Sequence, residues 1–204
     1  MQSGPVPVGQ AYDLYSPSAP HGQWFDPTFA LSLLPHLDQS LIEIFLDNLT
    51  LDEQGNLNID KLGNPDWSWQ LNQINTRIND IVTETCHHIG DRPLSKVALM
   101  GQSLGGITAW LVANKISRTS TENLGAIITD SAPILWQLDP ARLPSRVVVN
   151  TPTQDHLFQK WFTPCWNRLG EIKHIRYTDS LHHLQMSNEF KLDAGKALLG
   201  VIKE

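Results

Sequence analysis

The chain has 204 residues, of which 41% are apolar, which is enough for one sizeable core, so we expect a single domain over residues 1–204. Its 15 Lys and Arg against 21 Asp and Glu give a formal charge of -6, without a basic run that would bind nucleic acid or an anionic membrane. There is no apolar stretch of about 18 residues and no signal-peptide pattern, so we expect no membrane span and a cytoplasmic location.

Two cysteines, Cys86 and Cys165, are too few for a disulfide framework. Neither has the spacing of a Cys-x-x-Cys or Cys/His metal site. Both are therefore expected to be buried free thiols in a reducing compartment. The sequence predicts no metal site and no cofactor, and it does not indicate an oligomeric state.

The first half of the chain predicts few regular elements. Residues 1–20 are rich in Pro, Ser and Gly and indicate a loop or a short edge element. Apolar periodicity and turn residues then predict four segments: a helix at 27–37, a buried strand at 41–46, a surface loop at 52–66, and a long amphipathic helix at 69–86 that should stop near Gly90.

Strands and helices alternate in the second half. We expect strands at 96–100, 124–129, 146–150 and 172–177, and helices at 104–116, 157–169 and 188–202. Strands that alternate with helices of ten or more residues are typical of an α/β fold. The sequence therefore predicts a mostly parallel sheet with helices on both faces.

A candidate nucleophile lies in the run Gly-Gln-Ser-Leu-Gly-Gly at residues 101–106, between a predicted strand and a predicted helix. Outside that context the run would be an ordinary glycine-rich turn. A serine on a tight strand-to-helix turn has strained backbone angles, and we expect Gly101 and Gly105 to be required because a Cβ would collide there. The turn exposes the hydroxyl of Ser103, and the Leu104 N–H at the start of the helix would donate to an oxyanion.

A nucleophilic serine needs a base and an acid, which in this fold follow in the order Ser, Asp or Glu, His. Asp155 lies just past a predicted parallel strand, where α/β proteins place functional groups. It would also suit the N-cap of the next helix, and one carboxylate can serve both purposes. His182 and His183 follow the next predicted strand, and we choose His183 as the base, with His182 as the alternative.

Four segments together resemble the phospholipase/carboxylesterase family, which includes acyl-protein thioesterases: Leu94–Gly106, Gly125–Ala132, Val147–Asp155 and Tyr177–Glu189. The resemblance covers about half the chain, from Pro93 to the C-terminus. It implies an α/β-hydrolase fold without a metal or organic cofactor. The chain departs from the family in the nucleophile motif, where acyl-protein thioesterases typically have Phe-Ser-Gln and this sequence has Gln-Ser-Leu.

The N-terminal part admits two alignments with that family. In the first, His21-Gly22 is similar to the family's oxyanion loop, and the Gln23 N–H is the second oxyanion donor. In the second, residues 17–26 match a later segment of the family, and the chain lacks the early strands and their oxyanion loop. The fold would then be reduced at the N-terminal edge of its sheet.

These features predict a serine hydrolase that cleaves carboxylic ester or thioester bonds through an acyl-enzyme on Ser103. The expected triad is Ser103, Asp155 and His183, with Leu104 and Gln23 as oxyanion donors. The expected partner is a small-molecule or acylated substrate. Two other functions stay open: a non-catalytic binding protein of the same fold, and a peptidase-like hydrolase.

Overall fold

The computed structural model describes residues 47, 49–59, 65–134, 139–155, 157–162, 182–183 and 185–203. Several sequence predictions lie outside these residues: the N-terminal segment 1–20, the helix 27–37, the strands 41–46 and 172–177, the residues His21 and Gln23, and Cys165. Of the predicted helix 157–169, residues 157–162 are described, and residues 159–162 are helical.

A parallel sheet of three strands organises the described part of the chain. It consists of β3 (Ala98–Gln102), β4 (Ala126–Asp130) and β5 (Arg146–Asn150), in the order β3-β4-β5. Both strand pairs are parallel, so all three carboxyl ends lie at one edge of the sheet. The bounds of β5 agree with the prediction, whereas β3 lies two residues later than predicted because residues 94–96 form a 3-10 turn.

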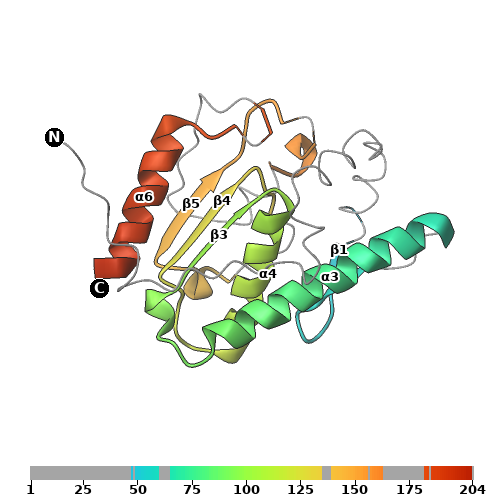
Figure 1. Ribbon diagram of the computed structural model, residues 1–204, viewed down its shortest axis with the longest axis horizontal. Helices are drawn as coiled ribbons and strands as arrows, with labels where there is room; N and C mark the ends of the chain where they lie inside the picture. Colours follow the sequence, from blue (N-terminus) through green and yellow to red (C-terminus); the bar gives the residue numbers. More distant parts are fainter. Residues whose placement is uncertain are drawn as a thin grey trace.

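Helices cover both faces of this sheet, as predicted, and the fold is of the α/β class. Figure 1 shows α4 (Leu104–Thr119) and α3 (Pro65–Ile89) on one side of the strands and α6 (Asn188–Lys203) on the other. On the α6 side, Phe190 and Ala194 pack against Ala126 and Ile128. In the described part of the chain, no helix is both long enough and apolar enough to cross a membrane.

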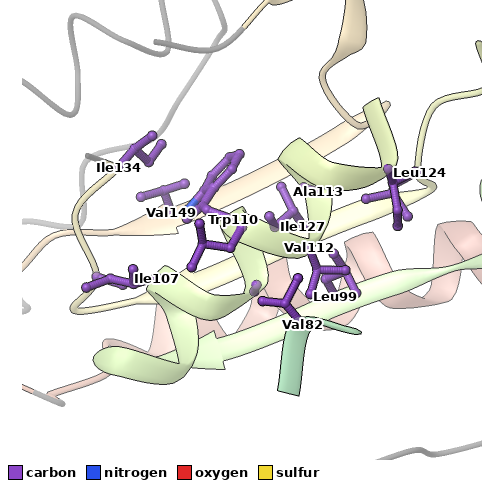
Figure 2. Packing of buried hydrophobic residues seen from close by; sticks show 14 of the residues in the cluster. Val82, Leu99, Ile107, Trp110, Val112, Ala113, Leu124, Ile127, Ile134 and Val149 are labelled. Atoms are coloured by element: carbon purple, nitrogen blue, oxygen red, sulfur yellow. The ribbon is translucent and has the colours of Figure 1, made fainter. Parts of the chain in front are cut away.

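The larger core lies between the sheet and α4, and Trp110 is at its centre (Figure 2). Trp110 has an exposed fraction of 0%, and its cluster includes the strand residues Ile127 and Val149. Its indole Nε1–H donates a hydrogen bond of 3.3 Å to Thr129 Oγ1, so the polar atom of this buried ring has a partner. This packing fixes α4, and therefore the residues just before it, against the sheet.

Replacement of Trp110 by alanine is expected to lower the free energy of unfolding by about 3–5 kcal/mol, because it leaves a large cavity between α4 and the sheet. Urea denaturation measures the change. Leu192→Ala is the control, since Leu192 is 59% exposed on α6 and its truncation should change stability by less than about 0.5 kcal/mol. Equal losses in the two variants would contradict the assignment of Trp110 to the core.

The predicted surface loop at 52–66 is wrong in two places. Strands β1 (Leu49–Leu51) and β2 (Leu57–Ile59) form an antiparallel hairpin, so the loop is a short turn. The carboxylate of Asp52 accepts hydrogen bonds from the backbone N–H of Gln54 (2.9 Å) and of Asn56 (2.8 Å), so these polar residues build the turn. The helix α3 begins at Pro65, inside the predicted loop, because proline is well tolerated in the first helical turn.

The end of α3 agrees with the prediction. Gly90 has a φ of 53°, and its N–H donates to the carbonyl of Cys86 at 3.1 Å, which is typical of a glycine that ends a helix. Cys86 is a free thiol that packs against the core and is half-buried. Burial raises the pKa of the Cys86 thiol, so little reactive thiolate forms at neutral pH.

Candidate active site

Ser103 lies on the sharp turn between β3 and α4. It has a φ of 51° and a ψ of -125°, a conformation that non-glycine residues rarely adopt. Its N–H donates to the carbonyl of Asp130 at 2.9 Å, which fixes the turn to the neighbouring strand β4. Serine at an N-cap commonly uses its hydroxyl to cap the helix, but Ser103 makes no such bond. The hydroxyl is therefore available to another partner.

The glycines of the motif are not all required for the reason expected from the sequence. A Cβ on Gly101 would lie 2.2 Å from the carbonyl oxygen of Gly105, and a Cβ on Gly106 would lie 2.4 Å from the Cβ of Ala132. A Cβ on Gly105 would meet no atom within 4 Å. The prediction for Gly105 is therefore wrong: the second glycine that close packing requires is Gly106, one residue later, where α4 approaches the segment after β4.

Two substitutions test this difference. Gly101→Ala is expected to lower the free energy of unfolding by at least about 1–3 kcal/mol, because the clash is with backbone that cannot rotate away. Gly105→Ala is expected to be neutral or to stabilise by about 0.5–1 kcal/mol, because alanine is the better helix former. Urea denaturation of both variants measures the changes, and a Gly105→Ala protein as unstable as Gly101→Ala would contradict the packing.

His183 joins the hydroxyl of Ser103 to the carboxylate of Asp155. Its Nε2 lies 3.1 Å from Ser103 Oγ, and its Nδ1 lies 2.7 Å from Asp155 Oδ2. The side chains of His183 and Asp155 are 9% and 0% exposed, so their pairing is largely shielded from water. His182 is exposed, and its backbone N–H donates to Gln185 Oε1 at 3.0 Å. Of the two histidines between which the sequence left a choice, His183 contacts Ser103.

Asp155 uses its two oxygens for two purposes. While Oδ2 faces His183, Oδ1 accepts the backbone N–H of Leu157 at 2.8 Å and of Phe158 at 2.9 Å. These are the bonds of a helix N-cap. The two roles that the sequence offered for this residue are thus both compatible with the geometry, because the cap fixes the carboxylate in the orientation that the imidazole requires.

Phe158 is a neighbour of the histidine that the sequence reasoning missed. Its ring makes an edge-to-face contact with the ring of His183, with the centroids 5.2 Å apart and the ring planes at 65° to each other. Phe158 is buried and also contacts Phe162. Aromatic residues just after Asp155 are a weak signal in the sequence, because core packing alone explains them.

The N-terminus of α4 lies beside the hydroxyl of Ser103. The first N–H groups of a helix have no acceptor within the helix. Among the described residues no hydrogen bond uses the N–H of Leu104 or of Gly105, whereas the N–H of Gly106 and of Ile107 both donate to the carbonyl of Ser103. The Leu104 N–H expected as an oxyanion donor is therefore free of other described partners, and the second expected donor, Gln23, lies outside the described residues.

Comparison with known proteins adds little to this geometry. No family model matches the chain, and no curated protein matches it. The crystal structure of an Arabidopsis thaliana SOBER1 variant is similar to it, with 15% sequence identity and a TM-score of 0.41, over 75% of this chain and 71% of that one. The α/β class of this chain follows from its own sheet and helices.

Proposed function

We propose that the chain is a serine hydrolase of the α/β-hydrolase type that cleaves carboxylic ester or thioester bonds through an acyl-enzyme on Ser103. One observation carries the proposal: an unbroken path leads from Ser103 Oγ to His183 Nε2 (3.1 Å) and from His183 Nδ1 to Asp155 Oδ2 (2.7 Å). A hydroxyl, an imidazole and a carboxylate in this order form a system for nucleophilic acyl transfer.

In the acylation step, Ser103 Oγ attacks the substrate carbonyl while His183 Nε2 takes the hydroxyl proton. Asp155 holds Nδ1 in its protonated tautomer and stabilises the imidazolium that forms. The tetrahedral oxyanion is stabilised by the N–H of Leu104 and by the positive end of the α4 dipole, with the N–H of Gln23 as a second proposed donor. The imidazolium then protonates the departing alcohol or thiol, and the acyl-enzyme remains.

Deacylation reverses these roles. His183 Nε2 accepts a proton from water, the resulting nucleophile attacks the acyl carbonyl, and the proton returns to Ser103 Oγ as the carboxylic acid leaves. None of these steps requires a metal or an organic cofactor. Membership of the phospholipase/carboxylesterase family is part of the proposal, supported by the sequence resemblance from Pro93 onward. A single domain and a cytoplasmic location stay predictions from the sequence.

Reaction with a fluorophosphonate probe tests the proposal, because such probes form a stable adduct with an activated serine. We expect one adduct on the full chain, located at Ser103 by peptide mass spectrometry and absent from Ser103→Ala. Ser95→Ala, which changes an exposed serine outside the site, should label as the unsubstituted chain does. Folded protein that forms no adduct would overturn the proposal in favour of a binding protein of the same fold. A panel of esters, thioesters and peptides then separates an esterase from a peptidase-like hydrolase.

A further inference from the structure

Three polar residues end the three strands of the sheet side by side. Gln102 on β3 pairs in register with Asp130 on β4, and Asp130 pairs in register with Asn150 on β5. Residues paired in register point their side chains to the same face of a sheet. The row therefore crosses the carboxyl edge of the sheet, directly beside the turn that carries Ser103.

Asp130 is the centre of this row. It is 1% exposed, and its Oδ2 accepts a hydrogen bond from Gln102 Nε2 at 2.9 Å. Its Oδ1 accepts from Asn150 Nδ2 at 2.6 Å and from Ser131 Oγ at 3.2 Å. A buried carboxylate with three donors is well satisfied, and hydrogen bonds to a charged acceptor are stronger than those between neutral groups. The carboxylate thus ties the ends of β3 and β5 to β4.

The same network extends to the segment that carries His183. The amide of Asn150 also donates to the carbonyl of Gln185 at 3.3 Å. Gln185 in turn closes a tight turn with His182, since its N–H donates to the His182 carbonyl and its Oε1 accepts the His182 N–H, both at 3.0 Å. His183 lies inside this closed turn, so Asn150 fixes the position of the turn relative to the sheet.

Asp130 is therefore linked to both members of the proposed reacting pair, directly to Ser103 and indirectly to His183. Its backbone carbonyl accepts the N–H of Ser103 at 2.9 Å, and its carboxylate orients the amide of Asn150, which carries the turn of His183. We propose that Asp130 is a positioning residue that holds His183 Nε2 within reach of Ser103 Oγ through Asn150 and Gln185. This role rests on the proposed hydrolase function, because it has no purpose if Ser103 is not a nucleophile.

Stability alone does not account for such a network. Replacing a buried polar cluster with apolar side chains of similar shape is often neutral or stabilising. Polar side chains at this edge therefore give the fold no stability that apolar packing would not also give. Hydrogen bonds have directions, however, and a network of them specifies a distance that apolar packing does not. A misplacement of about 1 Å between reacting groups can lower a rate by about 100-fold, which makes a specified distance valuable at this edge.

Asp130→Asn tests the proposal on the full chain. The amide replaces one acceptor with a donor, so the side chain can no longer accept from both Gln102 and Asn150. We expect the second-order rate constant of phosphonylation by a fluorophosphonate to fall by about 10- to 100-fold. With p-nitrophenyl acetate, the fall should be in kcat, and KM should change by less than about threefold. Asp80→Asn, the same change at an exposed position on α3, should leave both rates unchanged.

A double-mutant cycle separates positioning from a general structural role. If Asp130 acts through His183, then adding Asp130→Asn to a His183→Ala protein should cause no further loss of the residual phosphonylation rate. An equal loss in both backgrounds would overturn the proposal. If Asp130→Asn does not fold, the same double-mutant cycle is measured with Asn150→Ser, which removes the amide that donates to the Gln185 carbonyl. Failure of both variants to fold would assign the network to folding and would also overturn the proposal.

The outcomes for this proposal and for the hydrolase function are distinct. Absence of any adduct on the folded, unsubstituted chain contradicts the hydrolase function itself. If the unsubstituted chain forms the adduct and Asp130→Asn forms it at the same rate, the hydrolase function is supported and only the positioning role of Asp130 is contradicted.

Discussion

His183→Ala is expected to lower kcat for p-nitrophenyl acetate by about 10⁶-fold, close to the effect of Ser103→Ala. The imidazole of His183 lies within reach of Ser103 Oγ, at 3.1 Å, and can take its proton. Without a base the hydroxyl is a weak nucleophile. Because the two residues act as a unit, the double variant should be no slower than either single variant. Steady-state kinetics over a wide range of enzyme concentration measures kcat for His183→Ala, Ser103→Ala and the double variant.

His182→Ala is the matched control for this prediction, since it removes the same side chain from the adjacent position. His182 is exposed, and its described hydrogen bonds with Gln185 use backbone atoms that an alanine keeps. Its substitution should change kcat by less than about threefold. A large loss of kcat in His182→Ala together with a small loss in His183→Ala would identify His182 as the base and contradict the assignment of His183.

Asp155→Asn is expected to lower kcat by about 10⁴-fold with little change in thermal stability. The remaining carbonyl oxygen of the asparagine can still accept the N–H groups of Leu157 and Phe158, so the helix keeps its N-cap. The amide nitrogen, which replaces Oδ2, would face His183 Nδ1 as a donor. It would favour the tautomer with the proton on Nε2, and that tautomer cannot accept the proton of Ser103.

Asp155→Ala separates the two roles of the carboxylate. It should lower kcat at least as far as Asp155→Asn and should also lower the free energy of unfolding by about 0.5–2 kcal/mol, because the cap is lost. Kinetics and urea denaturation of the two variants give the comparison. If Asp155→Asn kept full activity, the carboxylate would be a helix cap and no more.

Local patterns were sufficient to predict much of the sheet and of the site. The strand at Arg146–Asn150 and the helix that begins at Leu104 are as expected, because β-branched residues and apolar periodicity are signals contained within each segment. The position of Ser103 between a strand and a helix follows from the same signals. The hairpin at 49–59 was missed, since three-residue strands are too short to show an alternating pattern.

The row of Gln102, Asp130 and Asn150 illustrates what sequence reasoning could not reach. Asn150 ends a predicted strand, and Gln102 and Asp130 lie within two residues after the ends of theirs. The separation of 28 positions from Gln102 to Asp130 gives no indication that the two side chains are in contact. Their alignment depends on the register of parallel strands, which the long connections between them do not fix. Gln102, the unusual glutamine before Ser103, therefore has a hydrogen-bond partner, Asp130, that only the folded structure shows.

The sequence by itself determined the α/β class and the position of a strained serine between β3 and α4, because both depend on periodicity and on glycine within short segments. It also determined the chain order of serine, aspartate and histidine. Tertiary structure alone decided that His183 rather than His182 contacts Ser103, that Gly106 rather than Gly105 has no room for a Cβ, and that Asp130 joins three strand ends. These outcomes depend on distances between segments far apart in the chain, and those distances are set by how the helices and strands pack.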